Sequence, residues 1–248
     1  MKEFFATGEQ LPQNSGWHMY DIHHGLWLLG IAAMISVACW YYRHLDTDKR
    51  KLFLKGLAVL IVIQEIMKDV IHLITGSFVL EHLPFHLCGL SIFICLAYAY
   101  RPGKIKKEMI YSLCMPGAMA ALIFPDWTNC PLWNFMNVNS FTIHGWLVMF
   151  CFVLLFSGEL KPDFRNLSKC FLFLLAIAPP LYLFNKCFGT NFMFLNVPAP
   201  GSPLEILAAL LGNPGYILGA IGLILVVWAL LYIPWEVGYR LEKKKESV

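Results

Sequence analysis

The sequence predicts an all-α polytopic membrane protein with seven transmembrane helices, and three observations lead to this prediction. Of the 248 residues, 58% are hydrophobic and only 14% are charged, whereas soluble domains are nearer half apolar and a quarter charged. The apolar residues form runs over the whole length of the chain instead of one anchor. Lys and Arg gather between these runs, at every second connection. We therefore expect one integral membrane domain over residues 1–248.

Seven runs of mostly apolar residues reach about 17 residues or more, which is the lower end of the length that a spanning helix needs. No internal repeat and no soluble domain separates them. The predicted spans cover residues 25–42, 53–75, 84–100, 109–124, 141–157, 169–185 and 215–234.

The positive charges predict the orientation of these spans. Sixteen of the 19 Lys and Arg residues flank the first, third and fifth connections or lie in the tail after residue 235; the others are Lys2, Lys68 and Lys186. Positive loops stay in the cytoplasm, so we expect the N-terminus outside and the C-terminus inside. The formal net charge of +3 is small, and we expect no nucleic-acid partner.

The outer connections are poor in charge, and two of them, 125–140 and 186–214, are long. Long loops of distinct composition often carry function, so we expect the chemistry near the outer face. We expect the segment 186–214, which is rich in Pro and Gly, to form an irregular cap there. Cys130 and Cys187 lie in these loops and are candidates for a disulfide, while Cys95, Cys114 and Cys151 lie in apolar runs where cysteine packs as a small hydrophobic residue.

The second predicted span carries an unusual polar face. Glu65, Lys68, Asp69 and His72 follow i, i+3, i+4, i+7 spacing and therefore share one side of a helix. Two interpretations stay open. The face could form an ion network that fixes helix packing, or it could line a site.

The segment Glu81–Cys88 places His82, His86 and Cys88 at the start of the third span. Pro84 suits the first turn of a helix, which would place His86 and Cys88 beside free backbone amides that favour a thiolate or an oxyanion. Ionisable groups at this depth are costly and therefore indicate function. A boundary histidine bonded to a loop carbonyl, with the cysteine as packing, is the alternative.

Two further segments reach the same predicted depth. His144 enters the fifth span from the outer side, so His86 and His144 could serve as base and orienting group. Asn185 ends the sixth span among apolar residues and needs hydrogen-bond partners. Asp126 lies in the outer loop that follows the fourth span.

Several segments, in their order along the chain, resemble the bacterial YwaF-type integral membrane proteins, relatives of the animal transmembrane protein 164. They are Leu83–Cys88, Gly117-Ala118 with Ala121-Leu122 and Pro125-Asp126, then His144-Gly145, and finally Asn185 with Gly189–Leu195.

The resemblance covers nearly the whole chain and implies a bacterial plasma-membrane protein. It also implies acyl transfer between glycerophospholipids, because the animal relative moves fatty acyl chains through a cysteine. In that relative the cysteine directly follows the proline, and here Phe85 holds the position. Cys88, three residues on, would lie on the same helical face one turn deeper.

The resulting hypothesis is a lipid acyltransferase whose substrates are membrane phospholipids and which needs no cofactor. His86 or His144 is the candidate base, and Cys88 is the candidate acyl carrier. Asn185, Asn191, Glu65, His72 and Asp126 are candidates for substrate binding or oxyanion stabilisation. A metal-dependent lipid hydrolase using His82, His86, His144 and Asp126 is one alternative, although we assign no metal ligands. A lipid or small-molecule carrier without chemistry is another.

Overall fold

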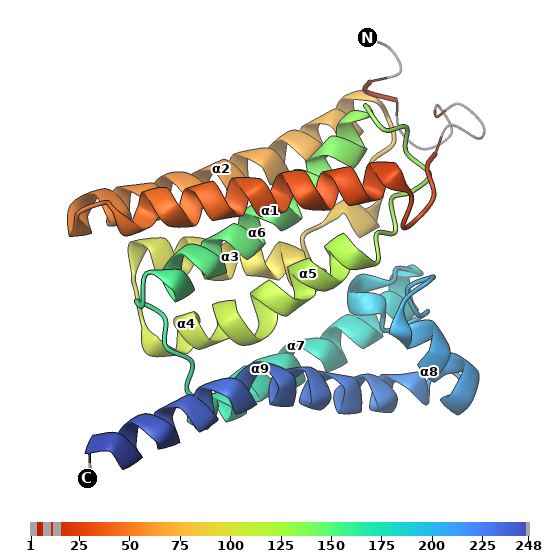
Figure 1. The fold of residues 1–248 in the computed structure, drawn as a ribbon. Helices are drawn as coiled ribbons and strands as arrows, with labels where there is room; N and C mark the ends of the chain where they lie inside the picture. Colours follow the sequence, from red (N-terminus) through yellow and green to blue (C-terminus); the bar gives the residue numbers. More distant parts are fainter. Residues whose placement is uncertain (1–3, 7–10, 12–15, 247–248) are drawn as a thin grey trace.

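The computed structural model describes residues 4–6, 11 and 16–246, and every regular element in that part of the chain is helical (Figure 1). The prediction of an all-α fold is therefore confirmed for these residues. The longer helices are α1 (Ile22–Arg43), α2 (Thr47–Ile74), α3 (Leu87–Tyr100), α6 (Phe135–Phe156), α7 (Leu167–Phe188) and α9 (Tyr216–Glu246).

One helical stretch changes its winding midway. Helix α4 (Lys104–Met109) continues into the π-helical turn η3 (Ile110–Cys114) and then into α5 (Met115–Ile123). Short 3-10 turns occur at η2 (Leu80–His82), η4 (Phe164–Asn166) and η5 (Phe192–Phe194), and α8 (Pro203–Leu211) is a short α-helix.

Local capping explains where several helices begin. The Asp21 side chain accepts a hydrogen bond from the backbone N–H of His24 at 2.9 Å, and Asp46 accepts one from Lys49 at 2.9 Å. Asn134 does the same for Met136 at 2.8 Å. These short polar side chains satisfy amides that have no partner within the first helical turn.

Helix α6 is the centre of the bundle. In its most apolar window 67% of the residues are buried, compared with 17% for α1 and 11% for α7. The outer helices instead expose large apolar side chains, including Leu29 and Val37 on α1, Leu172 on α7 and Leu218 on α9. Apolar side chains that face outward are expected where lipid replaces water as the solvent.

Five helical segments in the described residues are long and apolar enough to cross a membrane: Ile22–Arg43, Leu80–Tyr100, Phe135–Phe156, Phe164–Phe188 and Tyr216–Lys243. The chain is thus a membrane protein by length and composition. The other two predicted spans correspond to α2, whose apolar run is interrupted by Glu65, Lys68 and Asp69, and to the stretch η3–α5, which covers most of the predicted span 109–124.

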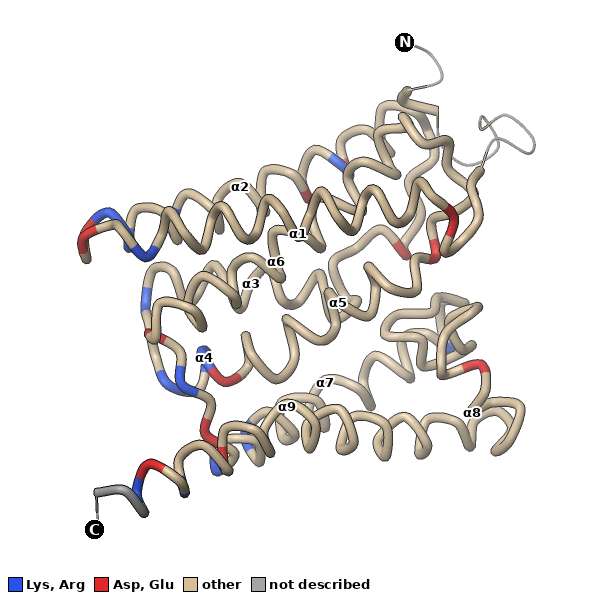
Figure 2. Tube along the Cα trace, viewed as in Figure 1, with Lys and Arg blue, Asp and Glu red and all other residues tan. Residues whose placement is uncertain are grey.

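The charged connections meet at one end of the molecule, which we call the basic end; it comprises residues 43–52, 101–108 and 157–169 together with the C-terminal part of α9. Figure 2 shows most Lys and Arg positions gathered there. Glu159 joins three of these segments, because it binds Arg50 at 3.1 Å, accepts from the Tyr42 hydroxyl at 3.1 Å and offers its carbonyl to Lys107. The connections that we expected on one side do lie together.

A second carboxylate attaches α9 to the basic end. Glu108 is 3% exposed, and it accepts hydrogen bonds from the Tyr232 hydroxyl of α9 and from the backbone N–H of Asp163 at 3.2 Å. At the adjacent π-helical turn, the Trp228 indole donates to the Ser112 carbonyl at 2.8 Å. A π-turn frees backbone groups from the regular helical pattern, and here one of them binds α9.

Two boundary predictions were wrong. Helix α3 begins at Leu87 rather than at residue 84, because Leu83, Pro84 and Phe85 form a turn ahead of it. The loop 186–214 contains α8, which begins at the Ser202 cap and packs on α9, where Gly219 admits the Leu207 and Leu211 side chains. A Cβ at position 219 would lie 2.8 Å from Leu211.

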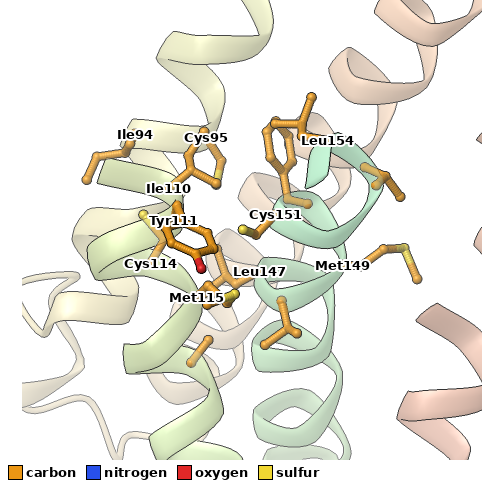
Figure 3. Close-up of a cluster of buried hydrophobic side chains, with 14 of the residues drawn as sticks. Ile94, Cys95, Ile110, Tyr111, Cys114, Met115, Leu147, Met149, Cys151 and Leu154 are labelled. Carbon is orange, nitrogen blue, oxygen red and sulfur yellow. The ribbon is translucent and has the colours of Figure 1, made fainter. Parts of the chain in front are cut away.

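Six of the eight cysteines are buried, and Cys88 and Cys187 are the exceptions. Cys95, Cys114 and Cys151 are buried at the junction of α3, the η3–α5 stretch and α6, as Figure 3 shows. Cys130 and Cys187 do not form the disulfide considered from the sequence, since both are free. Burial raises the pKa of Cys130 to about 11, so its thiol stays protonated at neutral pH.

Candidate functional site

The end opposite the basic end, which we call the loop end, comprises residues 75–86, 124–134 and 189–202. The polar face of α2 turns toward the first of these segments. Lys68 Nζ binds Glu65 at 2.6 Å, lies 3.4 Å from Asp69 Oδ1, and donates to the His82 carbonyl oxygen at 3.0 Å. The Glu65–His72 face therefore holds the chain that leads into α3.

A histidine stack makes the second contact between α2 and this chain. The rings of His72 and His82 are stacked with centroids 3.5 Å apart, and His72 Nδ1 lies 2.8 Å from Ser77 Oγ. His72 is 8% exposed. Both histidines thus contribute to the fold of the segment that carries His86.

Close backbone packing fixes the turn before α3. A Cβ atom on Gly89 would lie 2.6 Å from the Pro84 carbonyl, so only glycine admits the turn against the first helical turn. His86 is the N-cap residue of α3, with extended backbone angles, and its side chain does not cap the helix. The imidazole is therefore free to bind elsewhere.

The His86 ring lies in a socket formed by the loop after α7. It packs against Phe192 at 5.4 Å and Phe194 at 5.3 Å between ring centroids. His86 Nδ1 accepts a hydrogen bond from the backbone N–H of Met193 at 3.3 Å. Both Met193 and Phe194 have positive φ angles, an uncommon conformation for such residues, and the backbone bend presents the Met193 amide to His86.

Asn185 holds this loop in place. Its Oδ1 accepts from the Phe192 N–H at 2.9 Å and from the Thr190 hydroxyl at 2.8 Å, and its Nδ2 donates to the Phe192 carbonyl at 2.9 Å. Asn191 does likewise further along, where its Oδ1 accepts from the N–H groups of Asn196 and Val197. In this structure both asparagines serve the loop that positions His86.

His144 lies on α6 and is 7% exposed. Its Nδ1 lies 2.6 Å from the Ser140 carbonyl oxygen, and its ring stacks on Trp127 with centroids 5.2 Å apart and an interplanar angle of 7°. Its Nε2 is buried and has no hydrogen-bond partner in the part of the chain that the structure describes.

Several of the predicted site residues interact electrostatically. His86 lies within electrostatic reach of His144 and of Asp126, and His144 also lies within reach of Glu65. Cys88 lies within reach of Glu65 and Asp126. Groups from α2, the start of α3, α6 and the loop 124–134 therefore act electrostatically on one another.

The hydrogen bonds assign complementary tautomers to the two histidines. A carbonyl oxygen can only accept, so His144 Nδ1 carries the proton and its Nε2 is an acceptor in the neutral ring. A backbone N–H can only donate, so His86 Nδ1 accepts and its Nε2 carries the proton. One imidazole thus presents a base and the other a donor, which is the combination that acid–base chemistry requires.

The candidate nucleophile positions differ in surroundings. Phe85, where the resemblance would place a cysteine, packs its ring on Phe192 at 5.3 Å and Phe184 at 6.1 Å. Because Phe85 precedes α3, Cys88 does not share a helical face with it, and that prediction was wrong. Cys88 is partly buried in the first turn of α3, beside the backbone amides of Gly89 and of Cys88 itself.

Sequence reasoning missed Trp127. Its Nε1 is buried without a hydrogen-bond partner among the described residues, and its ring joins His144 to the aromatic ring of Phe141 at 5.3 Å. The signal was present, since Trp127 directly follows Asp126 in a loop that we already considered functional. Among the described residues, Asn139 Oδ1 is also buried without a hydrogen-bond donor, whereas the buried Asp69 Oδ1 lacks a hydrogen bond but is ion-paired with Lys68 at 3.4 Å.

The metal-dependent alternative gains no geometric support. Among the described residues, no three His, Cys, Asp or Glu side chains are grouped so that they could hold a metal ion. The residues considered for it are divided, because His82 stacks on His72 while His86 packs against Phe192 and Phe194.

Comparison with known proteins identifies the family of the chain. The family model described as TMEM164 family matches residues 19–232, which include α1 to α8, most of α9 and every residue placed at the loop end above. No curated protein and no solved structure matches the chain. Because this family model matches residues 19–232, which is most of the chain, the chain belongs to the TMEM164 family.

Proposed function

We propose that this protein transfers fatty acyl chains between glycerophospholipids at its loop end. The observation that carries the proposal is the pair of histidines from separate helices in complementary tautomers. His144 offers a buried Nε2 that has no hydrogen-bond partner among the described residues, and His86 offers an Nε2–H in an aromatic socket. The resemblance stated from the sequence supplies the reaction class, and membership of the family supports it.

The proposed reaction is a direct transfer. His144 Nε2 takes the proton of a hydroxyl group on the acceptor lipid while that oxygen attacks the ester carbonyl carbon of the donor. The carbonyl becomes an oxyanion, which the Nε2–H of His86 and the first-turn amides of α3 stabilise. The donor C–O bond then breaks, and the leaving alkoxide takes the proton back from His144. Atoms and charge balance without a cofactor.

A covalent route through Cys88 is the alternative within the same function. The thiol would lose its proton to His144 and attack the ester, giving a thioester and a free lipid hydroxyl; the acceptor hydroxyl would then cleave the thioester. The position of Cys88 in the first turn of α3 supports this route. At the position where the resemblance would place a cysteine, the chain has Phe85, whose ring packs on Phe192.

We also propose seven spans, of which α2 and the stretch 109–124, formed mainly by η3 and α5, complete the set. The basic end then faces the cytoplasm of a bacterial plasma membrane. The gathering of Lys and Arg at that end supports the orientation. Cys187, the exposed cysteine near the loop end, tests it. A membrane-impermeant maleimide should label Cys187 in intact cells and leave Cys187→Ser unlabelled. Labelling that requires permeabilised cells would reverse the orientation.

The test of the activity is an exchange assay in vesicles that contain the purified protein, an acyl-labelled phospholipid and an unlabelled lysophospholipid. His86→Ala and His144→Ala should each abolish the appearance of label in the acceptor. His23→Ala, which removes an exposed histidine in the first turn of α1, is the matched control and should be fully active. Full activity of both site variants would refute the proposal, and lipid movement without acyl exchange would favour a carrier.

A further inference from the structure

A long apolar groove lies on the bundle, formed by α1, α5 and α6. Its volume is about 790 Å³, and none of its lining residues is His86, Cys88 or His144. Its floor is buried and includes Ile35 and Cys39 of α1 and Val148 of α6. This volume lies within the range of about 300–1,000 Å³ that small-molecule sites occupy.

The groove opens toward the surface that lipid would cover. Ala32 and Ser36 of α1 and Met119 and Ile123 of α5 line it and are exposed. These helices present apolar residues to their surroundings, and the groove lies along predicted membrane spans. A soluble peptide would have no access there, whereas a lipid could enter sideways.

Its shape fits an extended hydrocarbon chain. The lining runs from Leu28 on α1 to its C-cap residue His44, which is about 24 Å at the helical rise per residue. One leaflet contributes roughly half of the approximately 30 Å hydrocarbon core. The groove is therefore long enough to hold an acyl chain that enters from one leaflet.

Charge occurs only at one end of this groove. Arg43 and His44 line it at the basic end, and Trp40 beside them suits the level of lipid headgroups. Within the described residues no ion pair uses the Arg43 guanidinium, whereas neighbouring Arg50 binds Glu159 and Lys51 binds Asp48. Arg43 is thus an unneutralised cation at the mouth of an apolar groove.

His44 extends this polar end. Its Nδ1 lies 2.7 Å from the Trp40 carbonyl oxygen and its ring packs on Trp40 at 4.8 Å between centroids. The remaining nitrogen, Nε2, becomes a second donor when the ring is protonated. Both side chains are exposed, and a phosphate group could reach them from the bilayer interface.

From this arrangement we propose that the α1–α5–α6 groove binds an anionic phospholipid of the leaflet at the basic end, with one acyl chain in the groove and the phosphate on Arg43. Under the proposed orientation this is the cytoplasmic leaflet. The site is separate from the histidine pair, so the two proposals can fail independently.

Photo-crosslinking tests this site. The protein is reconstituted in phosphatidylcholine vesicles with trace phosphatidylglycerol that carries a diazirine in its acyl chain, and labelled peptides are mapped by mass spectrometry. Ala32→Phe should fill the groove and lower labelling of the lining peptides several-fold. Ala33→Phe, at the next exposed position on α1 but outside the lining, should leave labelling unchanged. Ser36→Trp is a second filling variant if Ala32→Phe does not fold.

The headgroup preference is tested with the same probe and its phosphatidylcholine counterpart. Arg43→Gln should lower the ratio of phosphatidylglycerol to phosphatidylcholine labelling by about tenfold, the size expected for one charge-assisted hydrogen bond. Lys51→Gln, a paired cation nearby, should not change the ratio. Equal labelling of the Ala32 and Ala33 variants, or an equal headgroup ratio in the Arg43 and Lys51 variants, would overturn the proposal.

Discussion

The two ends of this molecule treat buried polar groups in opposite ways. At the basic end, the Glu159 carboxylate binds Arg50 and the Tyr42 hydroxyl, and its backbone carbonyl binds Lys107. The Glu108 carboxylate accepts hydrogen bonds from the Tyr232 hydroxyl and the Asp163 backbone N–H. In the half nearer the loop end lie four of the five buried side-chain atoms that lack a hydrogen-bond partner in the described residues. They belong to Trp127, Asn139, His144 and Asp69, of which Asp69 is ion-paired with Lys68 at 3.4 Å; the fifth belongs to Ser112 in η3.

This difference indicates that the two ends have different roles. A buried polar atom without a partner costs about 1–3 kcal/mol, and retaining several of them in one region is unfavourable for stability alone. The unpartnered atoms include acceptors, such as His144 Nε2, and a donor, Trp127 Nε1. We infer that the basic end stabilises the bundle, and that the polar groups near the loop end are available to a substrate.

The largest expected effect comes from His144→Asn. An asparagine amide can replace Nδ1–H in the bond to Ser140 and offers nothing at the position of Nε2, so it removes the base while keeping the local hydrogen bond. We expect the exchange rate to fall by about 10²–10⁴-fold, the contribution typical of general base catalysis, with only a small change in melting temperature. A normal exchange rate in this variant would show that Nε2 is not the base.

Asn185→Ala should have an intermediate effect on both activity and stability. It removes the partners of Thr190 and of the Phe192 backbone, so the loop that presents the Met193 amide to His86 loosens. We expect about a tenfold loss of exchange and about 1–3 kcal/mol of destabilisation from the buried groups left unpaired. Asn213→Ala, an exposed loop asparagine bound to the Asn196 carbonyl, is the control. Equal behaviour of the two variants would contradict this role.

Glu108→Gln tests the basic end through the pH dependence of stability. Burial raises the pKa of Glu108 above its ordinary value, so its neutral form favours folding and that contribution is lost as pH rises through the folded-state pKa. The melting temperature of the wild type should therefore fall relative to Glu108→Gln between pH 5 and pH 8, by roughly 2–4 °C per kcal/mol.

Exchange activity at neutral pH should be the same in both proteins, since Glu108 lies far from the histidine pair. Glu242→Gln, which removes an exposed carboxylate of α9, should reproduce the wild-type pH profile. A parallel pH profile for wild type and Glu108→Gln would show that this carboxylate does not control the stability of the basic end.

The smallest expected effect is that of Cys88→Ser. Direct transfer does not use the thiol, so exchange should stay within about twofold of wild type, and no acyl group should be found on the protein by intact-mass measurement. Loss of exchange together with an acylated wild-type protein would replace direct transfer by the covalent route.

The sequence predicted the basic end better than the loop end, for a physical reason. Charge placement and apolar run length are local properties, so the gathering of Arg50, Lys107 and Lys161 at one end could be inferred from positions along the chain. The bond from Lys68 to the His82 carbonyl and that from Met193 to His86 join distant segments. Spacing alone cannot specify them.

Local errors had equally specific causes. Pro84 indicated a helix start, but the close approach of Pro84 to Gly89 sets a turn there and delays α3 to Leu87. The Pro and Gly content of residues 186–214 indicated an irregular segment and hid α8, which Ser202 caps. By contrast, the expectation that Asn185 needs hydrogen-bond partners is confirmed, because it binds Thr190 and Phe192.

The most direct measurement is a double-mutant cycle on acyl exchange in vesicles, using His86→Ala, His144→Ala and the double variant, each checked for melting temperature. If the two imidazoles act as one acid–base unit, each single variant loses nearly all exchange and the double variant loses little more. Independent effects that multiply in the double variant, or exchange that survives in it, would contradict the assignment of the chemistry to this pair.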